Sequence, residues 1–513
     1  MCGIPAAYYF DQCAMNAFGV CGRVIRCRHR SGRPLSRGRA DRQLSRRKQG
    51  SESQVYQCDP WTDLNITATT AVGALRGVVE HEVVTFRGVP YAQADRFAQP
   101  RPIPPWEGER AATEDGPICP QLPSRLEAVM GKPELHEQLE DCLSLTITTP
   151  SADDAARPVL VWFHGGGFTT GAGSLRCYGG HRLTRDGNIV VVAVNYRVGI
   201  FGYLMAEGIS AGNLATADHL AALQWVHANI SAFGGDPHNV TIAGQSAGAH
   251  SVLCLLGMPS TRGLFTRAIL QSGPAFLGIG SARMARHGGK RFLAHLNGDP
   301  RTASTAEILR AQEQMVLDSA GFLNLSPSSG LTTIPGVEPL PDNRQWADEI
   351  RMRANDLDII IGTTGQEMSA FHRQNTAMKR LRKLPILGPL IASTIEHTLG
   401  EIIFGAPARR IARRLAKAGA RVWIYKFDYR APASTFGATH CIELPFLLGT
   451  DTDWEHAPML AGAHSEDIAA IGQRTRAAWL SFIRSGAPVV TPAWQPYSPS
   501  TRSIYRLGSP DDR

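Results

Sequence analysis

The chain has 513 residues, of which 43% are hydrophobic and 19% charged, a balance typical of globular proteins. The nearest candidate for a transmembrane helix, residues 189–206, is interrupted by Asn195 and Arg197, so we expect no membrane span. The net charge of +8 belongs to the start of the chain: residues 1–50 hold eleven Lys and Arg against two Asp, which leaves residues 51–513 at −1. This distribution gives no support for nucleic-acid binding.

Residues 1–65 are basic and hold five of the ten cysteines. They lack the apolar core of a secretory signal, so we expect a cytoplasmic protein. The spacing of Cys21, Cys27 and His29 matches no zinc template well, and no metal or organic cofactor is implied. We expect this leader to be disordered or to result from a misassigned start site, and residues 66–513 to form the folded domain.

Beyond the leader, short β-branched runs alternate with helical patterns. Residues 72–76 and 82–86 are predicted to form two short paired strands, and residues 218–232 have helical periodicity. Further strands are predicted at residues 143–149, 159–163, 189–194, 239–243, 268–271, 358–361 and 422–427. Strands that alternate with helices favour an α/β fold, with a largely parallel sheet covered by helices on both faces.

Residues 244–248 read Gly-Gln-Ser-Ala-Gly, the spacing of a nucleophile elbow. A β-branched run, residues 239–243, precedes this pentapeptide, and an apolar run, residues 249–256, follows it. A serine on a strained turn between a strand and a helix needs small neighbours two positions away, which Gly244 and Gly248 provide. The pattern predicts that Ser246 is a nucleophile.

The loop after the predicted strand 159–163 reads His-Gly-Gly-Gly-Phe, residues 164–168. Glycines allow backbone N–H groups to approach a developing oxyanion, and each such donor contributes about 3 kcal/mol in the transition state. A phosphate-binding loop is excluded because no Gly-Lys-Ser/Thr follows. We therefore predict an oxyanion hole here.

Eight segments in order resemble the type B carboxylesterase family, the cholinesterase-like branch of the α/β-hydrolases, and the resemblance covers roughly residues 69–508. The most specific are the two motifs above, Glu140-Asp-Cys-Leu143, Gly362-Thr-Thr-Gly-Gln-Glu367 and His440-Cys-Ile-Glu-Leu-Pro-Phe446. The resemblance implies an α/β-hydrolase fold with a large, mostly parallel sheet and cap insertions. It also implies hydrolysis of a small-molecule carboxylic ester, and it leaves the oligomeric state open.

The resemblance assigns Ser246 as nucleophile, Glu367 as the acid and His440 as the general base. Spacing alone does not select Glu367 over Asp356 or Asp358, nor His440 over His456 or His464. The resemblance further implies an oxyanion hole from the backbone N–H groups of Gly166, Gly167 and Ala247. It implies a disulfide between Cys119 and Cys142 and a salt bridge between Arg96 and Glu140.

Gln245 departs from the family, which often has glutamate before the nucleophile. We expect this change to remove a carboxylate from the rim of the site and to disfavour cationic alcohols, so that small to medium uncharged esters are the expected substrates. Two alternatives are a non-catalytic binding protein, which typically lacks a triad member, and a hydrolase that uses the same triad on amides, lactones or polyesters.

Residues 378–391 join a basic cluster to an apolar run that contains two prolines. This composition is compatible with a lipid-contacting patch. The prolines favour instead a cap helix that walls the pocket.

Overall fold

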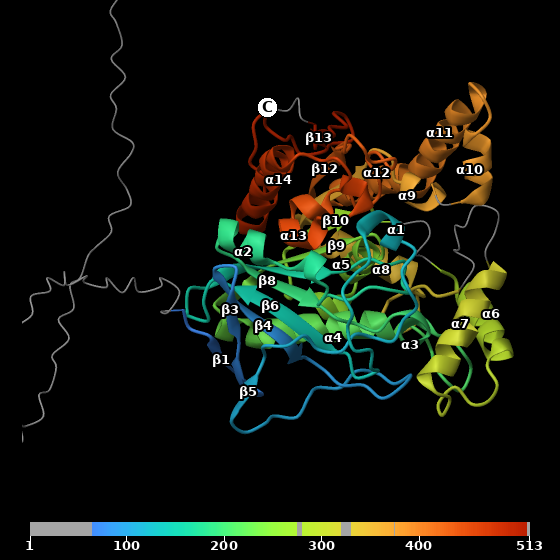
Figure 1. Ribbon diagram of the computed structural model, residues 1–513. Helices are drawn as coiled ribbons and strands as arrows, with labels where there is room; N and C mark the ends of the chain where they lie inside the picture. The colour runs from blue at the N-terminus through green and yellow to red at the C-terminus, as the bar shows by residue number, and fades with distance from the viewer. Residues whose placement is uncertain (1–63, 274–279, 320–329, 374, 510–513) are drawn as a thin grey trace, which may run out of the picture. The chain divides into compact units, whose positions relative to one another are not determined.

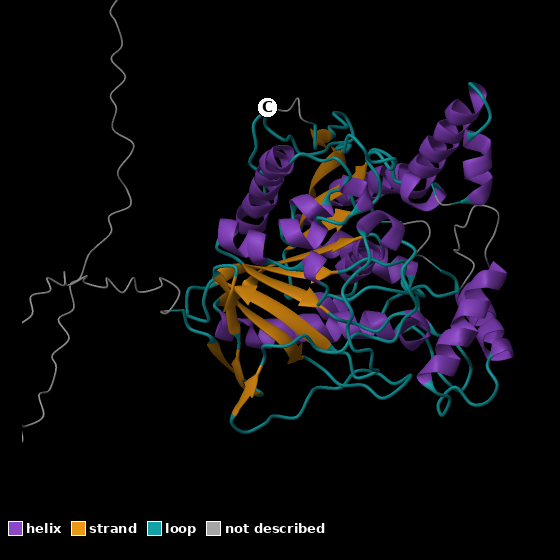
Figure 2. Ribbon diagram, viewed as in Figure 1, coloured by secondary structure: helices purple, strands orange, loops and turns teal. Residues whose placement is uncertain are grey.

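The computed structural model describes residues 64–273, 280–319, 330–373 and 375–509, so most of the predicted leader lies outside the described residues. A ten-stranded sheet passes through the middle of the described domain with helices on both sides (Figures 1 and 2). Its strand order is β13-β12-β11-β10-β9-β7-β8-β6-β4-β3. The strands from β13 to β8 run parallel, whereas β6, β4 and β3 are antiparallel. The predicted α/β fold with a mostly parallel sheet is confirmed.

The strands are β1 (Thr67–Thr70), β2 (Gly73–Arg76), β3 (Val78–Glu80), β4 (Val83–Pro90), β5 (Glu109–Ala111), β6 (Ser144–Thr149), β7 (Arg157–Phe163), β8 (Val190–Val194), β9 (Gly235–Gln245), β10 (Arg267–Gln271), β11 (Asp358–Thr364), β12 (Arg421–Phe427) and β13 (Tyr505–Leu507). The α-helices are α1 (Glu127–Met130), α2 (His181–Gly187), α3 (Gly199–Tyr203), α4 (Leu214–Asn229), α5 (Ala247–Leu256), α6 (Ala282–His295), α7 (Thr305–Ser319), α8 (Asn343–Arg353), α9 (Ser369–His372), α10 (Thr376–Arg382), α11 (Leu387–Gly400), α12 (Ala406–Ala418), α13 (Asp451–Trp454) and α14 (Ser465–Ser485).

Residues 159–163 of β7 and all of β8 are apolar because both faces of these central strands are buried. In β7, Val159, Val161 and Phe163 enter the core that contains side chains of α4, α5 and α12. Leu160 and Trp162 enter the other core, with side chains of α2 and α14. The helices on the two faces thus hold the carboxyl ends of the parallel strands in fixed positions.

The predicted pairing of residues 72–76 with residues 82–86 is wrong. β2 lies between β1 and β5 in a separate three-stranded sheet, whereas β4 lies between β3 and β6 in the main sheet. The reason is a tight turn at His81 and Glu82, both of which have positive φ angles (47° and 68°). Such a turn pairs β4 with β3, the three-residue strand that ends directly before the turn.

The family resemblance implies two contacts in the segment of the chain between β4 and β6. Arg96 and Glu140 form an ion pair, in which Arg96 Nε is 2.8 Å from Glu140 Oε2. Cys119 and Cys142 are both buried, but both are free thiols, so the predicted disulfide is not formed in this structure. A hydrogen bond with Cys119 and burial raise the pKa of the Cys142 thiol well above its usual value, which disfavours the thiolate needed for oxidation.

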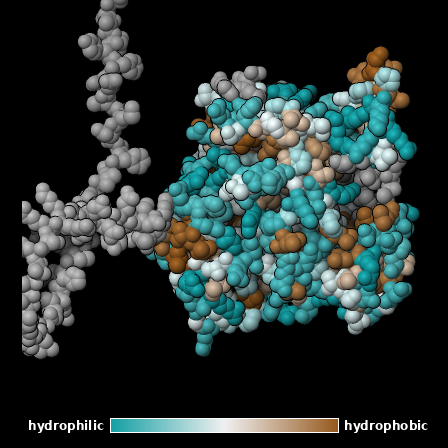
Figure 3. Space-filling model, in the orientation of Figure 1, coloured by the Kyte–Doolittle hydropathy of each residue, from teal (hydrophilic) through white to brown (hydrophobic). Residues whose placement is uncertain are grey.

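The basic and apolar segment 378–391 lies in a hairpin of the two helices α10 and α11. Its tip exposes a group of aliphatic side chains, seen at the upper right of Figure 3: Leu384, Ile386, Leu387, Leu390 and Ile391. The apolar run therefore faces solvent at the tip instead of walling a closed pocket there, which differs from the expected cap helix. No helix in the described ranges is long and apolar enough to cross a membrane.

Candidate active site

Ser246 lies at the junction between β9 and α5, with φ 56° and ψ −121°, a combination that side-chain-bearing residues rarely adopt. The Ser246 N–H donates to the Gln271 carbonyl oxygen at the end of β10, at 2.8 Å. A Cβ atom on Gly244 would lie 2.5 Å from the carbonyl carbon of Gly248, and one on Gly248 would lie 2.0 Å from the Phe163 oxygen. Both glycines are therefore required by close backbone approach, as the pentapeptide indicates.

The loops that follow the parallel strands bring the other predicted residues to the same edge of the sheet. Glu367 comes three residues after β11, and His440 lies in the loop after β12. A bridge between Gln366 and Thr439 joins these two loops. The carboxyl ends of parallel strands are where this kind of sheet holds its ligands and reactive groups.

His440 and Glu367 are in direct contact in a buried setting. His440 Nδ1 is 2.5 Å from Glu367 Oε2, and the two side chains are 0% and 3% exposed. The other carboxylate oxygen, Oε1, accepts from the Ser272 hydroxyl and from the Thr364 N–H, both at 2.7 Å. Three donors therefore fix the carboxylate, and the carboxylate fixes the orientation of the imidazole.

Gln245, the residue before the serine, contacts the other imidazole nitrogen. Its Nε2 lies 3.1 Å from His440 Nε2. A proton on Nδ1, facing Glu367, leaves a lone pair on Nε2 that accepts from this amide. Gln245 is 1% exposed, so the expectation that position 245 lies on the rim of the site is wrong. The β9 register turns this side chain inward toward the histidine.

The glycine loop after β7 approaches the serine closely. A Cβ atom on Gly165 would lie 3.2 Å from the Cβ of Ser246. Gly166 and Gly167 have positive φ angles (121° and 63°), and a Cβ on Gly166 would lie 1.9 Å from the Thr170 oxygen. Within the described part of the chain, no hydrogen bond is formed by the N–H groups at the three predicted oxyanion-hole positions, Gly166, Gly167 and Ala247. These groups are available to a ligand.

A second carboxyl group, Glu443, is buried behind the histidine. Its exposed fraction is 0%, and burial, with a smaller contribution from the nearby Glu367 carboxylate, raises its pKa to about 8. The Gln271 amide donates to Glu443 Oε1 at 3.5 Å. Glu443 is thus uncharged at neutral pH, and Glu367 is the carboxyl group that touches His440.

Comparison with known proteins identifies the family of the chain. The model of the carboxylesterase family matches residues 64–384 and 390–512. The chain belongs to the carboxylesterase family. It is 42% identical to a probable N-octanoylanthranilate hydrolase of Rhodococcus erythropolis over 86% of this chain and 97% of the relative. It is 33% identical to the para-nitrobenzyl esterase of Bacillus subtilis over 86% of this chain and 94% of that protein.

Solved structures of this family have the same fold. A para-nitrobenzyl esterase structure matches with a TM-score of 0.74 and 30% identity, over 86% of this chain and 95% of that one. A carboxylesterase of Geobacillus stearothermophilus matches with a TM-score of 0.72 and 32% identity, over 86% and 96% of the two chains. The protein is a carboxylic-ester hydrolase with an α/β-hydrolase fold.

The sequence analysis missed two polar residues near His440 and Glu367. Ser272 holds Glu367, and its position directly after the predicted strand 268–271 was the available signal. Glu443 lies inside the histidine motif but its burial is visible only in three dimensions. The competing candidates do not reach the site: Asp358 pairs with Arg421, and His456 is an exposed residue beside Glu455.

Proposed function

We propose that this carboxylesterase acts through an acyl-enzyme formed on Ser246. The Ser246 hydroxyl attacks the ester carbonyl while His440 Nε2, which contacts the Gln245 amide in this structure, exchanges that amide for the serine and takes its proton. The oxyanion of the tetrahedral intermediate accepts from the N–H groups of Gly166, Gly167 and Ala247. His440 then protonates the leaving alcohol, and the acyl group stays on the serine. Water, deprotonated by His440, releases the carboxylate and restores the enzyme.

The observation that supports this assignment best is the buried His440–Glu367 contact, in which His440 also touches Gln245, the residue before a serine on a strained turn. The Nδ1 to Oε2 distance of 2.5 Å favours the tautomer in which Nε2 is the proton acceptor. The anionic carboxylate also stabilises the imidazolium that forms when the serine is deprotonated. The three backbone N–H groups without protein partners supply the oxyanion contacts.

We propose uncharged esters of small to medium size as the substrates. Position 245 carries an amide, and Glu443 is neutral at pH 7 because its pKa is raised to about 8. The carboxyl group in contact with His440, Glu367, already has three hydrogen-bond partners in the protein, namely Ser272, the Thr364 N–H and the imidazole. The described surroundings of the triad therefore offer a cationic alcohol no uncompensated negative charge.

A second candidate substrate class is the N-acyl amide. The relative with 42% identity carries the name N-octanoylanthranilate hydrolase. The same proposed nucleophile, base and oxyanion donors serve amide and ester carbonyls. The two classes can be separated with p-nitrophenyl octanoate and N-octanoyl-p-nitroaniline, an ester and an amide that share the acyl group. A ratio of kcat/KM for the ester to kcat/KM for the amide near unity would favour amides as the substrates.

The test of the proposed mechanism is Ser246→Ala with p-nitrophenyl butyrate. We expect kcat to fall by at least about 1,000-fold, because residual catalysis comes from the oxyanion contacts and binding alone. Ser251→Ala is the matched control, since Ser251 is another buried α5 hydroxyl and donates to the Ala247 oxygen at 3.2 Å. Turnover by Ser246→Ala at the rate of the control would refute the assignment.

A further inference from the structure

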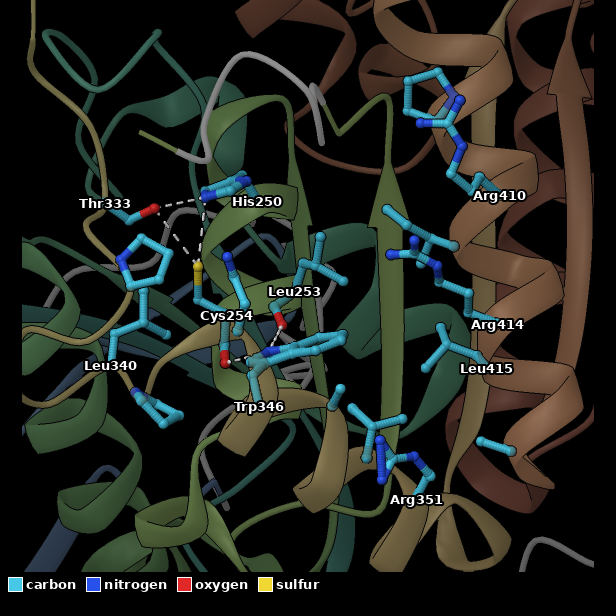
Figure 4. Close-up of a pocket in the computed structure, with 18 of the residues that line it drawn as sticks. His250, Leu253, Cys254, Thr333, Leu340, Trp346, Arg351, Arg410, Arg414 and Leu415 are labelled. Atoms are coloured by element: carbon cyan, nitrogen blue, oxygen red, sulfur yellow. Dashed lines mark hydrogen bonds between the residues drawn. The ribbon is translucent and has the colours of Figure 1, made fainter. Parts of the chain in front are cut away.

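A cavity of about 860 Å³ lies between α5, α8 and α12, and Figure 4 shows its lining. Its volume is within the range of about 300–1,000 Å³ found for ligand sites. None of Ser246, His440 and Glu367 lines it. α5, which begins directly after Ser246, contributes its second and third turns to the wall.

The wall of this cavity is largely apolar. The side chains that form most of it are Leu253, Leu340, Trp346, Ile350, Ile411 and Leu415. The Trp346 indole N–H donates to the carbonyl oxygens of Leu253 and Cys254 at 3.1 and 3.2 Å, which fixes the ring against α5. A fixed aromatic ring among aliphatic side chains is a surface that favours an apolar ligand group.

The polar part of the lining has one sign of charge. Arg351, Arg410, Arg414 and Lys417 line the cavity, and none of its described lining residues is Asp or Glu. Arg410 and Arg414 extend from α12 toward the α5 side (Figure 4). Arg410, Arg414 and Lys417 form no ion pair with any described residue, whereas Arg351 pairs with Asp348. Among the residues that the structure describes, these three cations beside an apolar surface thus have no anionic partner.

His250 adds a buried polar group to the same cavity. It is 1% exposed; its Nε2 is 2.8 Å from the Thr333 hydroxyl, and no described residue binds its Nδ1. Burial lowers the pKa of His250 to about 4, so the ring is neutral at pH 7. A buried nitrogen without a partner is costly unless a ligand or water satisfies it.

We propose that this cavity binds an amphipathic carboxylate, with its apolar tail against Leu253, Trp346 and Leu415 and its carboxylate at Arg410 and Arg414. The hydrolysis of a carboxylic ester releases a ligand of this class, so the reaction itself supplies it. The cations repel positively charged ligands. A neutral ligand of the same length gains no attraction from Arg410, Arg414 and Lys417, so we expect it to bind more weakly than the carboxylate.

The test is isothermal titration calorimetry of the full chain with sodium decanoate and, as the neutral counterpart, 1-decanol. The variant Arg410→Gln/Arg414→Gln removes two cations from the cavity. The control Arg344→Gln/Arg413→Gln removes two exposed cations from α8 and α12 that do not line it. Ala347→Trp fills the cavity from α8 without a change of charge.

We expect the unaltered protein to bind decanoate more tightly than decanol. Arg410→Gln/Arg414→Gln should weaken decanoate binding about fivefold or more and leave decanol binding unchanged, whereas the control pair should stay within about twofold. Ala347→Trp should weaken both ligands. Equal binding of decanoate by the cavity variant and the control pair, or binding unaffected by Ala347→Trp, would overturn the proposal; circular dichroism spectra establish that each variant is folded.

Discussion

Ser272→Ala tests whether the carboxylate of Glu367 must be held rigidly for His440 to act as a base. The Ser272 hydroxyl donates to Glu367 Oε1 at 2.7 Å, and both side chains are buried. The substitution leaves the carboxylate with the Thr364 N–H and the imidazole. It removes no group that the structure places next to the proposed nucleophile.

The size of the effect follows from the charge of the acceptor. A hydrogen bond to a charged group contributes about 1.5–3 kcal/mol, more than a neutral one. Since His440 gains its positive charge in the transition state, most of this loss should appear there, as a fall in kcat of roughly 10- to 100-fold. KM should change little, because Ser272 is 0% exposed and does not reach a substrate.

The pH dependence gives a second readout. A carboxylate that has lost one donor attracts the His440 imidazolium more strongly, so the acid limb of the kcat/KM profile should move to higher pH. Ser251→Ala, which removes a buried hydroxyl that donates to a backbone oxygen, is the control. If Ser272→Ala kept kcat within twofold of Ser251→Ala, with an unmoved acid limb, the positioning role would be refuted.

Three further predictions concern buried groups. Between pH 4.5 and about 8 the folded state holds one proton more than the unfolded state at Glu443, so the free energy of unfolding falls as pH rises, by about 1.4 kcal/mol per pH unit. Glu443→Gln should therefore have a higher thermal midpoint than the unaltered protein at pH 8 and no such advantage at pH 4.5; equal midpoints at both pH values would contradict the raised pKa. Gln245→Glu should raise the ratio of kcat/KM for butyrylthiocholine over an uncharged butyryl thioester by about tenfold, as expected for a carboxylate within about 8 Å of the cation; an unchanged ratio would show that position 245 does not set the charge preference. Alkylation of the unfolded, unreduced protein should modify both Cys119 and Cys142, and mass spectrometry that finds them linked would contradict the free thiols.

Much of the fold could be predicted because the pattern of residues within each segment is enough to indicate a strand. The runs 159–163 and 190–194, which form β7 and β8, are apolar throughout, as expected for strands buried on both faces, and Gly244 and Gly248 indicate the turn at Ser246 because that turn requires small neighbours. The pairing of β2 and β4 was wrong because a turn with two positive φ angles at non-glycine residues carries no clear signal in sequence.

The candidate site residues could be named from sequence, but the contacts that support them could not. Motif spacing indicated Ser246, whereas His440 and Glu367 were selected by the family resemblance, and their contact depends on how the loops after β11 and β12 meet. The side chain of Gln245 points inward, toward His440, because of the register of β9. This register could not be predicted from the sequence. Support of this kind arises from contacts between residues far apart in the chain, so only the folded structure reveals it.

The most direct test of the central claim is covalent labelling with diisopropyl fluorophosphate, followed by mass spectrometry of the digested protein. An activated serine beside a general base should react once per chain, and the mass increase should map to Ser246. Loss of esterase activity should follow the extent of labelling. A label on another residue, or full inactivation while Ser246 remains unmodified, would contradict the account.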